Sequence, residues 1–172
     1  MTRQISLLLV ALLQFGCTSL PENVTPVKDF DLNQYLGPWY EIARMDHSFE
    51  RNLIKVTANY SRRDDGGVDV INRGYNVKTK EWEQADGKAY FVSSPDVGHL
   101  KVSFFGPFYS SYVVIALDKG NYQYAMVGGP DYSYLWILSR KPRLDKDIQQ
   151  QLMQTARQLG YDTDELIIVP QE

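Results

Sequence analysis

The sequence is poor in the residues that most often build reactive or metal sites. It has one cysteine, Cys17, and two histidines, His47 and His99, among 172 residues. One cysteine excludes a disulfide within the chain and a zinc site made of several cysteines. The chain also lacks the G-x-S-x-G, H-E-x-x-H and phosphate-loop motifs. We therefore expect no enzymatic activity, no metal and no cofactor.

The chain also lacks an excess of positive charge and a hydrophobic run long enough to span a membrane. Lys and Arg number 18 against 21 Asp and Glu, a net charge of −3 without a basic block, so we expect no binding to nucleic acid. The apolar run over residues 5–13 is short, because a spanning helix needs about 20 residues. Arg3 precedes this run, an order typical of a secretory signal peptide.

Cys17 comes shortly after the apolar run, and this arrangement resembles the lipobox of bacterial lipoproteins. The resemblance implies a signal peptide over residues 1–16, a diacylglyceryl anchor on Cys17 and a tether over residues 17–29. Thr18, in place of the Asp associated with inner-membrane retention, favours the outer membrane. The alternative is an ordinary secretory signal followed by an incidental cysteine.

What the sequence does contain is a series of short runs with alternating apolar residues, bounded by turn residues. Such runs predict an all-β protein. The expected strands are residues 39–44, 55–63, 68–76, 82–92, 100–105, 112–118, 122–127 and 135–140. Short connections (64–67, 95–98, 118–121) alternate with long ones (45–54, 106–111, 128–133). This alternation favours an eight-stranded antiparallel up-and-down β-barrel with a closed base and an open mouth.

One amphipathic segment follows the eighth run. Asp145 is a suitable N-cap, and Gly160 is a suitable end of the helix. The apolar residues between them fall on one helical face: Ile148, Leu152, Ala156 and Leu159. We expect a helix packed on the outer wall of the barrel, followed by a short ninth strand over residues 166–169.

Three motifs resemble the signatures of the lipocalin family, at the distances that the family shows. They are Asn33-x-Tyr35-x-Gly37-x-Trp39-Tyr40-Glu41, Leu117-Asp118 and Arg140. The stretches 37–44, 102–109 and 134–140 are similar to the bacterial outer-membrane lipocalins in particular. The resemblance implies one lipocalin domain over residues 30–172. It also implies a structural role for Gly37, Trp39, Asp118 and Arg140, with Trp39 plugging the base and Arg140 stacked on its indole.

Alternation along each strand divides the barrel wall into two faces. With Trp39 taken as inward, Glu41 and Ala43 share its face, and the resemblance to the lipocalin pattern implies which face of each other strand points inward. The predicted pocket lining is Glu41, Ala43, Val56, Ala58, Tyr60, Val70, Asn72, Ala89, Phe91, Leu100, Val102, Phe104, Tyr112, Val114, Tyr134, Trp136 and Leu138, with Gly87 and Ala116 on the same face. Small residues there predict a hollow interior; the alternative is a barrel filled by its own side chains. An acid at Glu41 must be hydrogen-bonded, hydrated or protonated. It could bond Tyr112 or Tyr134, or it could exclude anionic head groups from the depth of the pocket.

An elongated apolar interior suits an acyl chain. The mouth then carries the head-group candidates: Phe49, Arg51, Phe108 and Tyr109, with Tyr132 nearby. Phe108 and Tyr109 could instead form a patch for membrane or partner contact, and Arg51 could be a solvated charge.

The resemblance implies a lipid binder on the periplasmic side of the outer membrane. As a monomer or homodimer, it would store or transport fatty acids or lysophospholipids and support membrane maintenance under stress. The alternatives are a binder of haem, a pigment or another hydrophobic ligand, and a lipocalin-type enzyme using Glu41 with a tyrosine.

Overall fold

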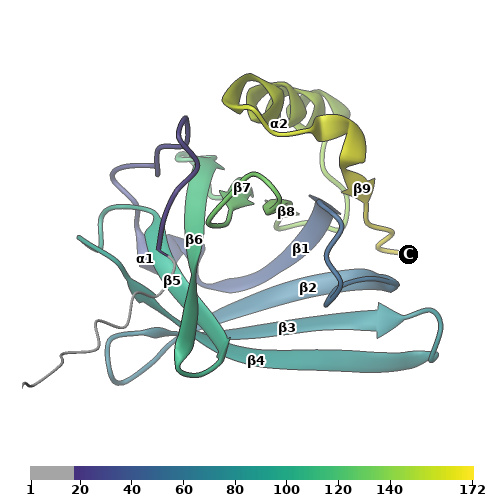
Figure 1. The fold of residues 1–172 in the computed structure, drawn as a ribbon, viewed down its shortest axis with the longest axis horizontal. Coiled ribbons are helices and arrows are strands. Elements are labelled where there is room, and N and C mark those ends of the chain that lie inside the picture. Colours follow the sequence, from purple (N-terminus) through teal and green to yellow (C-terminus); the bar gives the residue numbers. More distant parts are fainter. Residues whose placement is uncertain (1–17) are drawn as a thin grey trace, which may run out of the picture.

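The computed structural model describes residues 18–172; the expected signal peptide and Cys17 lie outside the described residues. The elements are α1 (Leu32–Tyr35), β1 (Gly37–Arg44), β2 (Leu53–Arg62), β3 (Val68–Asn76), β4 (Glu81–Phe91), β5 (His99–Phe105), β6 (Phe108–Leu117), β7 (Tyr124–Gly128), β8 (Leu135–Ser139), α2 (Lys146–Leu159), the 3-10 turn η1 (Thr163–Glu165) and β9 (Ile167–Ile168). Neighbouring strands pair antiparallel, and β1 pairs with both β8 and β2, which closes an eight-stranded barrel (Figure 1). The predicted fold is confirmed.

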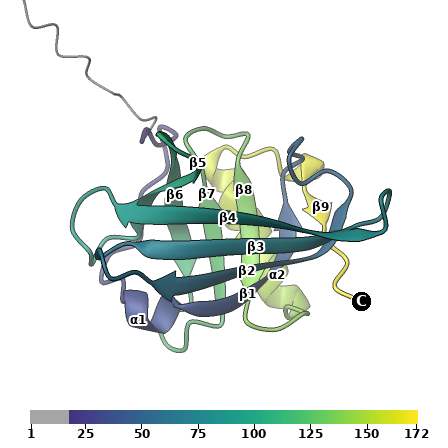
Figure 2. The ribbon, with the colours of Figure 1, turned by 90° about the horizontal axis from the view of Figure 1, so that it is seen from below.

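Two of the connections differ from the expected alternation. The β5–β6 connection, expected to be long, is a two-residue turn at Gly106–Pro107, because Phe105 and Phe108 already face each other as a strand pair. The β4–β5 connection, expected to be short, takes up the seven residues from 92 to 98. The β3–β4 ribbon extends beyond the other strands at the open end (Figure 2).

A bulge in β1 reverses the facing of the residues after Glu41. Glu41 pairs with Leu138 but Ala43 pairs with Ile137, so one extra residue lies between the two pairs. A bulge breaks the period of two, so Ala43 packs in the cluster beneath α2 and Arg44 takes the inward position opposite Trp136. The predicted inward position of Ala43 is therefore wrong.

A second bulge, in β6, has the same effect. Val114 pairs with Val127 but Ala116 pairs with Met126, and Ala116 packs with the residues beneath α2. Ala116 therefore lies outside the barrel, contrary to the expectation. Both alanines leave room for the helix rather than for a ligand.

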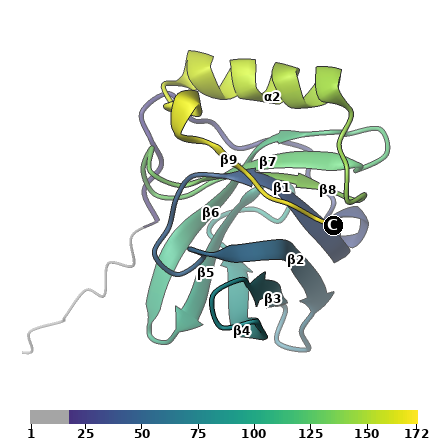
Figure 3. The same ribbon diagram turned by 90° about the vertical axis from the view of Figure 1, so that its right-hand side faces the viewer.

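Helix α2 lies along one outer side of the barrel, over β7, β8 and β1 (Figure 3). The Asp145 side chain accepts from the backbone N–H groups of Asp147 and Ile148, and Gly160 ends the helix at φ +105°. Leu152 and Ala156 are buried against the outward side chains of the wall. The predicted helix and its apolar face are confirmed.

Residues 18–29 pack along the barrel instead of forming a free tether. The Val27 N–H donates to the Val114 carbonyl (2.9 Å), and the Val27 carbonyl accepts from the Gly98 N–H (2.8 Å). Val24 is buried in the cluster beneath α2. The expectation of a tether missed these apolar side chains, which are too widely spaced to form a periodic pattern.

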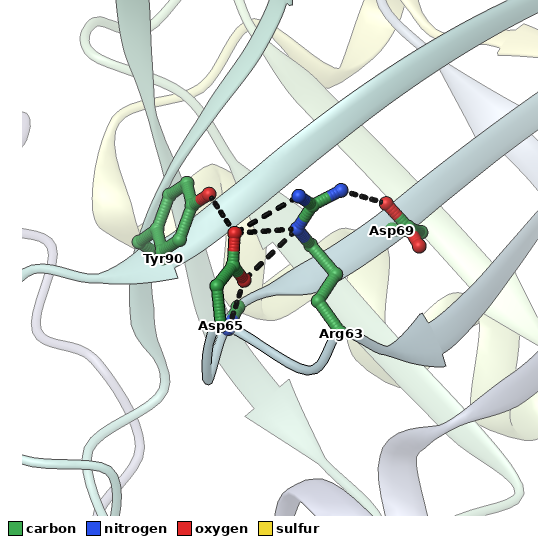
Figure 4. Close-up of polar contacts among 5 residues, drawn as sticks. Arg63, Asp65, Asp69 and Tyr90 are labelled. Atoms are coloured by element: carbon green, nitrogen blue, oxygen red, sulfur yellow. Dashed lines mark hydrogen bonds and ion pairs between the residues drawn. The ribbon is translucent and has the colours of Figure 1, made fainter.

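The β2–β3 turn at the closed end is pinned by a surface ionic network (Figure 4). The Arg63 guanidinium pairs with Asp65 and Asp69, and the Tyr90 hydroxyl donates to Asp65 (2.9 Å). Hydrogen bonds from Arg63, Gly67 and Tyr90 hold the pKa of the Asp65 carboxyl well below its usual value. Because every member already has a partner, we assign this network to turn stability.

Candidate functional site

The closed half of the barrel interior is filled by side chains. Trp39 is fully buried, its indole N–H donates to the Tyr35 carbonyl (2.8 Å), and the Arg140 guanidinium lies 3.9 Å from its ring centroid. Arg140 also donates to the carbonyls of Pro38 and Gln34. This is the arrangement that the resemblance implies, and it seals the base.

A chain of tyrosines fills the space next to Trp39. The Tyr112 hydroxyl bonds those of Tyr35 (2.7 Å) and Tyr60 (2.8 Å). The remaining void is about 10 Å³, lined by Phe30, Leu32, Tyr35, Tyr60, Val68, Val70, Ala89, Leu100 and Tyr112. No alkyl chain fits in such a void, so the expected hollow does not extend through the closed half.

In the open half of the barrel, the inward side chains are less completely buried than in the closed half. Strand β4 pairs with β5 only from Lys88 to Phe91, so residues 81–87 have no strand partner on that side. Inward side chains that stay half-buried are Ala58, Asn72, Val102, Phe104 and Trp136. Solvent therefore reaches the interior wall at this end, and Ala85, one alternation before Gly87, is exposed.

The structure turns most of the predicted lining residues inward. Those packed in one interior cluster are Ala58, Tyr60, Val70, Ala89, Phe91, Leu100, Val102, Phe104, Tyr112, Val114, Trp136 and Leu138. Val56 is buried beside Gly74, and Asn72 lies opposite Ala58. A Cβ at Gly87 would lie 2.8 Å from Phe104. The space expected at Gly87 is thus occupied by a neighbouring ring.

A buried ionic cluster is embedded in the open half. Glu41 Oε1 accepts from Arg44 Nη1 (2.8 Å), and Arg44 Nη2 donates to the carbonyls of Glu50 and Leu53. The Trp136 indole N–H donates to Glu50 Oε2 (3.0 Å). The partner of Glu41 is therefore Arg44, not the tyrosine that the sequence suggested.

Two buried acids share one arginine in this cluster. Burial, and to a smaller extent the charge of Glu50, raises the pKa of Glu41 to about 8, against the opposing effect of Arg44. Burial also raises the pKa of Glu50. A carboxyl at the edge of an apolar interior thus holds a proton near neutral pH.

Five buried polar atoms have no partner within residues 18–172: Arg44 Nε, His47 Nε2, Asn72 Oδ1, Ser103 Oγ and Tyr161 Oη. Arg44 belongs to this cluster, and the His47 ring lies 5.1 Å from the ring of Trp136. A buried unpaired donor or acceptor costs free energy unless a ligand or water satisfies it. The His47 ring stacks between Phe49 and Tyr134, with centroids 5.0 and 4.6 Å away. The sequence did not predict that Arg44 and Glu50 belong to this site, because no sequence pattern predicts the bulge that turns Arg44 inward.

The residues predicted at the mouth lie in different places and have different partners. Arg51 is exposed and already paired with Asp46 (2.5 Å), which weakens it as a head-group ligand. Tyr109 lies on the outer wall, beside Tyr90 and Lys101. Tyr132 packs edge-on against Tyr161 and accepts from the Asn23 N–H. Neither tyrosine is therefore free to bind a head group as a mouth residue, whereas Phe49 and Phe108 are exposed at the open end.

A groove of about 370 Å³ lies at the closed end, lined by Phe30, Asp31, Leu32, Asn33, Arg62, Gly66, Phe91, Pro95 and Asp96. Its polar groups are bonded within the protein: Arg62 donates to Asn33 (2.7 Å), and Asp31 caps α1. The unpaired Arg44 Nε, His47 Nε2 and Asn72 Oδ1 do not line this groove, which makes the open half the better candidate site.

Within residues 18–172 no three metal-binding side chains gather in one place. His99 bonds Ser111 (2.9 Å) and is buried away from the open half. Over the same residues, neither helix combines the length and apolarity needed to cross a bilayer.

Comparison with known proteins agrees with this architecture. Residues 30–171 match the lipocalin-like domain family. The outer membrane lipoprotein Blc of Vibrio cholerae is 54% identical over 170 residues, which cover 99% of each chain. The protein of the same name from Escherichia coli K12 is 53% identical over 94% of this chain and 92% of its own length.

A solved structure shows the same fold at low identity. Insecticyanin from the tobacco hornworm Manduca sexta superposes with a TM-score of 0.68 at 24% identity, covering 88% of this chain and 86% of its own. At this identity the likeness concerns the fold alone.

Proposed function

The chain belongs to the lipocalin family, and on this premise we propose that it binds a single-chain lipid, a fatty acid or a lysophospholipid, in the open half of its barrel. The observation that carries the proposal is the inward apolar wall that stays half-buried there, at Ala58, Val102 and Trp136. An apolar wall with a few orienting polar groups is the usual character of a small-molecule site.

The position of the ligand follows from the contrast between the two halves. The void of about 10 Å³ beside the tyrosines excludes an acyl chain from the closed half. The chain would lie along Val102 and Phe104, and the unpaired Arg44 Nε and Asn72 Oδ1 would bond an oxygen and a hydroxyl of the ligand. We propose a binding role rather than an enzymatic one, because Glu41 accepts a hydrogen bond from Arg44 instead of pairing with a tyrosine.

The names of the similar proteins and the sequence around Cys17 support an anchored lipoprotein of the outer membrane. We propose a diacylglyceryl anchor on Cys17, the periplasmic face of that membrane and a role in envelope maintenance under stress. Growth with radiolabelled palmitate should label the protein. The Cys17→Ser variant should lose both the label and its recovery with outer membranes, and a labelled C17S protein would contradict the anchor.

Native mass spectrometry of protein purified without detergent tests the ligand. We expect a mass excess that corresponds to one lipid and disappears on denaturation. A barrel that is empty in every preparation, and that takes up no added fatty acid, would contradict the proposal.

Two neighbouring substitutions in β4 test the location. Ala85 is exposed and on the inward face, whereas the adjacent Gln84 is exposed and outward. A85W should weaken the binding of a fluorescent fatty acid about tenfold or more, since the indole fills apolar contact area that the chain would otherwise use. Q84W adds the same ring outside and should leave affinity unchanged. Equal affinity of the two variants would move the site elsewhere.

A further inference from the structure

The tip of the β5–β6 hairpin carries two phenylalanines that the fold leaves in water. Phe105 and Phe108 are register partners on either side of the Gly106–Pro107 turn, which joins the strands labelled β5 and β6 in Figure 1. They are 83% and 78% exposed, the highest values among the exposed large hydrophobic residues in the described part of the chain. Neither ring belongs to the interior cluster or to the cluster beneath α2. The two rings therefore contribute little to either core.

The residues next to the pair in the sequence carry no charge. Residues 102–117, which include the hairpin tip, contain no Asp, Glu, Lys or Arg. Exposed apolar patches mark contact with a protein partner or with a membrane, and protein interfaces carry a polar rim around their apolar core. An exposed aromatic pair on an uncharged projecting tip fits an apolar phase into which the tip can insert.

The start of the described chain lies at the same end of the barrel. In an up-and-down barrel the β5–β6 and β7–β8 connections share one end. Ser19 Oγ donates to the Pro130 carbonyl (3.4 Å) and the Asn23 N–H to the Tyr132 hydroxyl (3.3 Å), both in the β7–β8 connection. Cys17 is two residues before Ser19, a reach of at most about 7 Å. A lipid on Cys17 would thus hold the open end at a membrane.

We propose that the β5–β6 hairpin is a membrane-docking element, which inserts Phe105 and Phe108 into the interfacial layer of a lipid bilayer. The open half of the barrel then faces the bilayer surface. A hydrophobic ligand passes between membrane and barrel without crossing bulk water. The proposal rests on the exposed pair and on the position of the N-terminal segment, and it holds whichever hydrophobic ligand the barrel takes.

A fluorescent label at the tip tests the insertion. The full chain, expressed with residues 1–17 and purified from membranes, is reconstituted into vesicles of phosphatidylethanolamine and phosphatidylglycerol. A Gly106→Cys variant carries a polarity-sensitive maleimide dye, since a Cβ at Gly106 meets no atom within 4 Å. Gly120→Cys, in the β6–β7 turn at the opposite end, is the matched control, with its nearest atom 3.5 Å away. The unsubstituted protein gives the background from Cys17.

Nitroxide-bearing lipids should quench the dye at position 106 several-fold more than the dye at position 120. Adding F105S and F108S to the Gly106→Cys protein should reduce quenching to the level of position 120. Adding V92S, which removes an exposed apolar side chain at the closed end, should change nothing. Circular dichroism checks that each variant keeps its fold.

Three results would overturn the proposal. They are equal quenching at positions 106 and 120, quenching that survives F105S and F108S, and a dye response that follows the protein-to-lipid ratio, which would assign the pair to contact with a second copy of the chain. The same comparison with protein added to vesicles from solution gives the test without the anchor on Cys17. If the protein binds a lipid but position 106 shows no insertion, this inference is overturned and the proposed function still stands.

Discussion

The two halves of the barrel interior are built from the same strands but differ in two respects: how many buried polar atoms have a hydrogen-bond partner, and how completely the apolar side chains are buried. At the closed end Trp39, Arg140 and the tyrosine hydroxyls have partners, and almost no void remains. At the open end buried polar atoms stay unpaired and apolar wall residues stay half-buried. The difference separates the half that stabilises the fold from the half that is available to a ligand.

Of the substitutions that follow, replacing Trp39 in the closed half should lower the free energy of unfolding most. W39A leaves a large cavity and removes the ring beneath Arg140, so we expect a loss of about 3–5 kcal/mol in the free energy of unfolding. Urea denaturation measures it. The control W82A removes a half-exposed indole at the open end and should cost less than about 1 kcal/mol. Similar losses in both variants would mean that the two halves do not differ in this way.

Removing the Tyr112 hydroxyl tests the tyrosine chain itself. Y112F leaves the hydroxyls of Tyr35 and Tyr60 without their shared partner, and such a loss costs about 1–3 kcal/mol. The control Y90F removes a hydroxyl that bonds Asp65 on the surface, and it should change the denaturation midpoint little. An unchanged midpoint in Y112F would show that the chain contributes no net stability.

The acid pair in the open half should make stability fall as pH rises. Because the pKa of Glu41 is raised from 4.5 to about 8, the folded state keeps a proton that the unfolded chain releases between these values. This contribution is fully present below about pH 4.5 and is lost as pH rises through about 8, with a slope of at most about 1.4 kcal/mol per pH unit. Denaturation at several pH values should show the slope, and E41Q should flatten it. An equal slope in E41Q would assign the titration elsewhere.

The smallest effect on stability is expected where β1 and β2 separate beside the open half. Strands β1 and β2 pair only from Gly37 to Tyr40, and beyond this the Gln171 side-chain amide donates to the carbonyls of Glu41 (2.7 Å) and Val56 (3.0 Å). We expect Q171A to lower the free energy of unfolding by about 1 kcal/mol. Faster exchange of the amide protons in β1 and β2 would accompany it, whereas Q150A on the exposed face of α2 should change neither quantity.

Sequence patterns predicted the strands and the helix because these depend on local chemistry, whereas the sealed base was implied by the resemblance to the lipocalin motifs. Alternation set the strand faces, Asp145 and Gly160 set the ends of α2, and the G-x-W motif with Arg140 identified the base. The candidate site was predicted less well. Ala43, expected to point inward, packs beneath α2. Of the expected mouth residues, Tyr109 lies on the outer wall and Tyr132 packs against Tyr161, whereas Arg44 and Glu50 were not expected in the interior.

The sequence by itself therefore determined the fold and the end at which the barrel closes. The tertiary structure alone decided which residues line the open half, because a bulge shifts the facing of all later residues in a strand and depends on pairing with β8 and packing against α2. It also decided that the closed half is filled, since the tyrosines that fill it come from α1, β2 and β6, and only closure of the barrel brings their hydroxyls together.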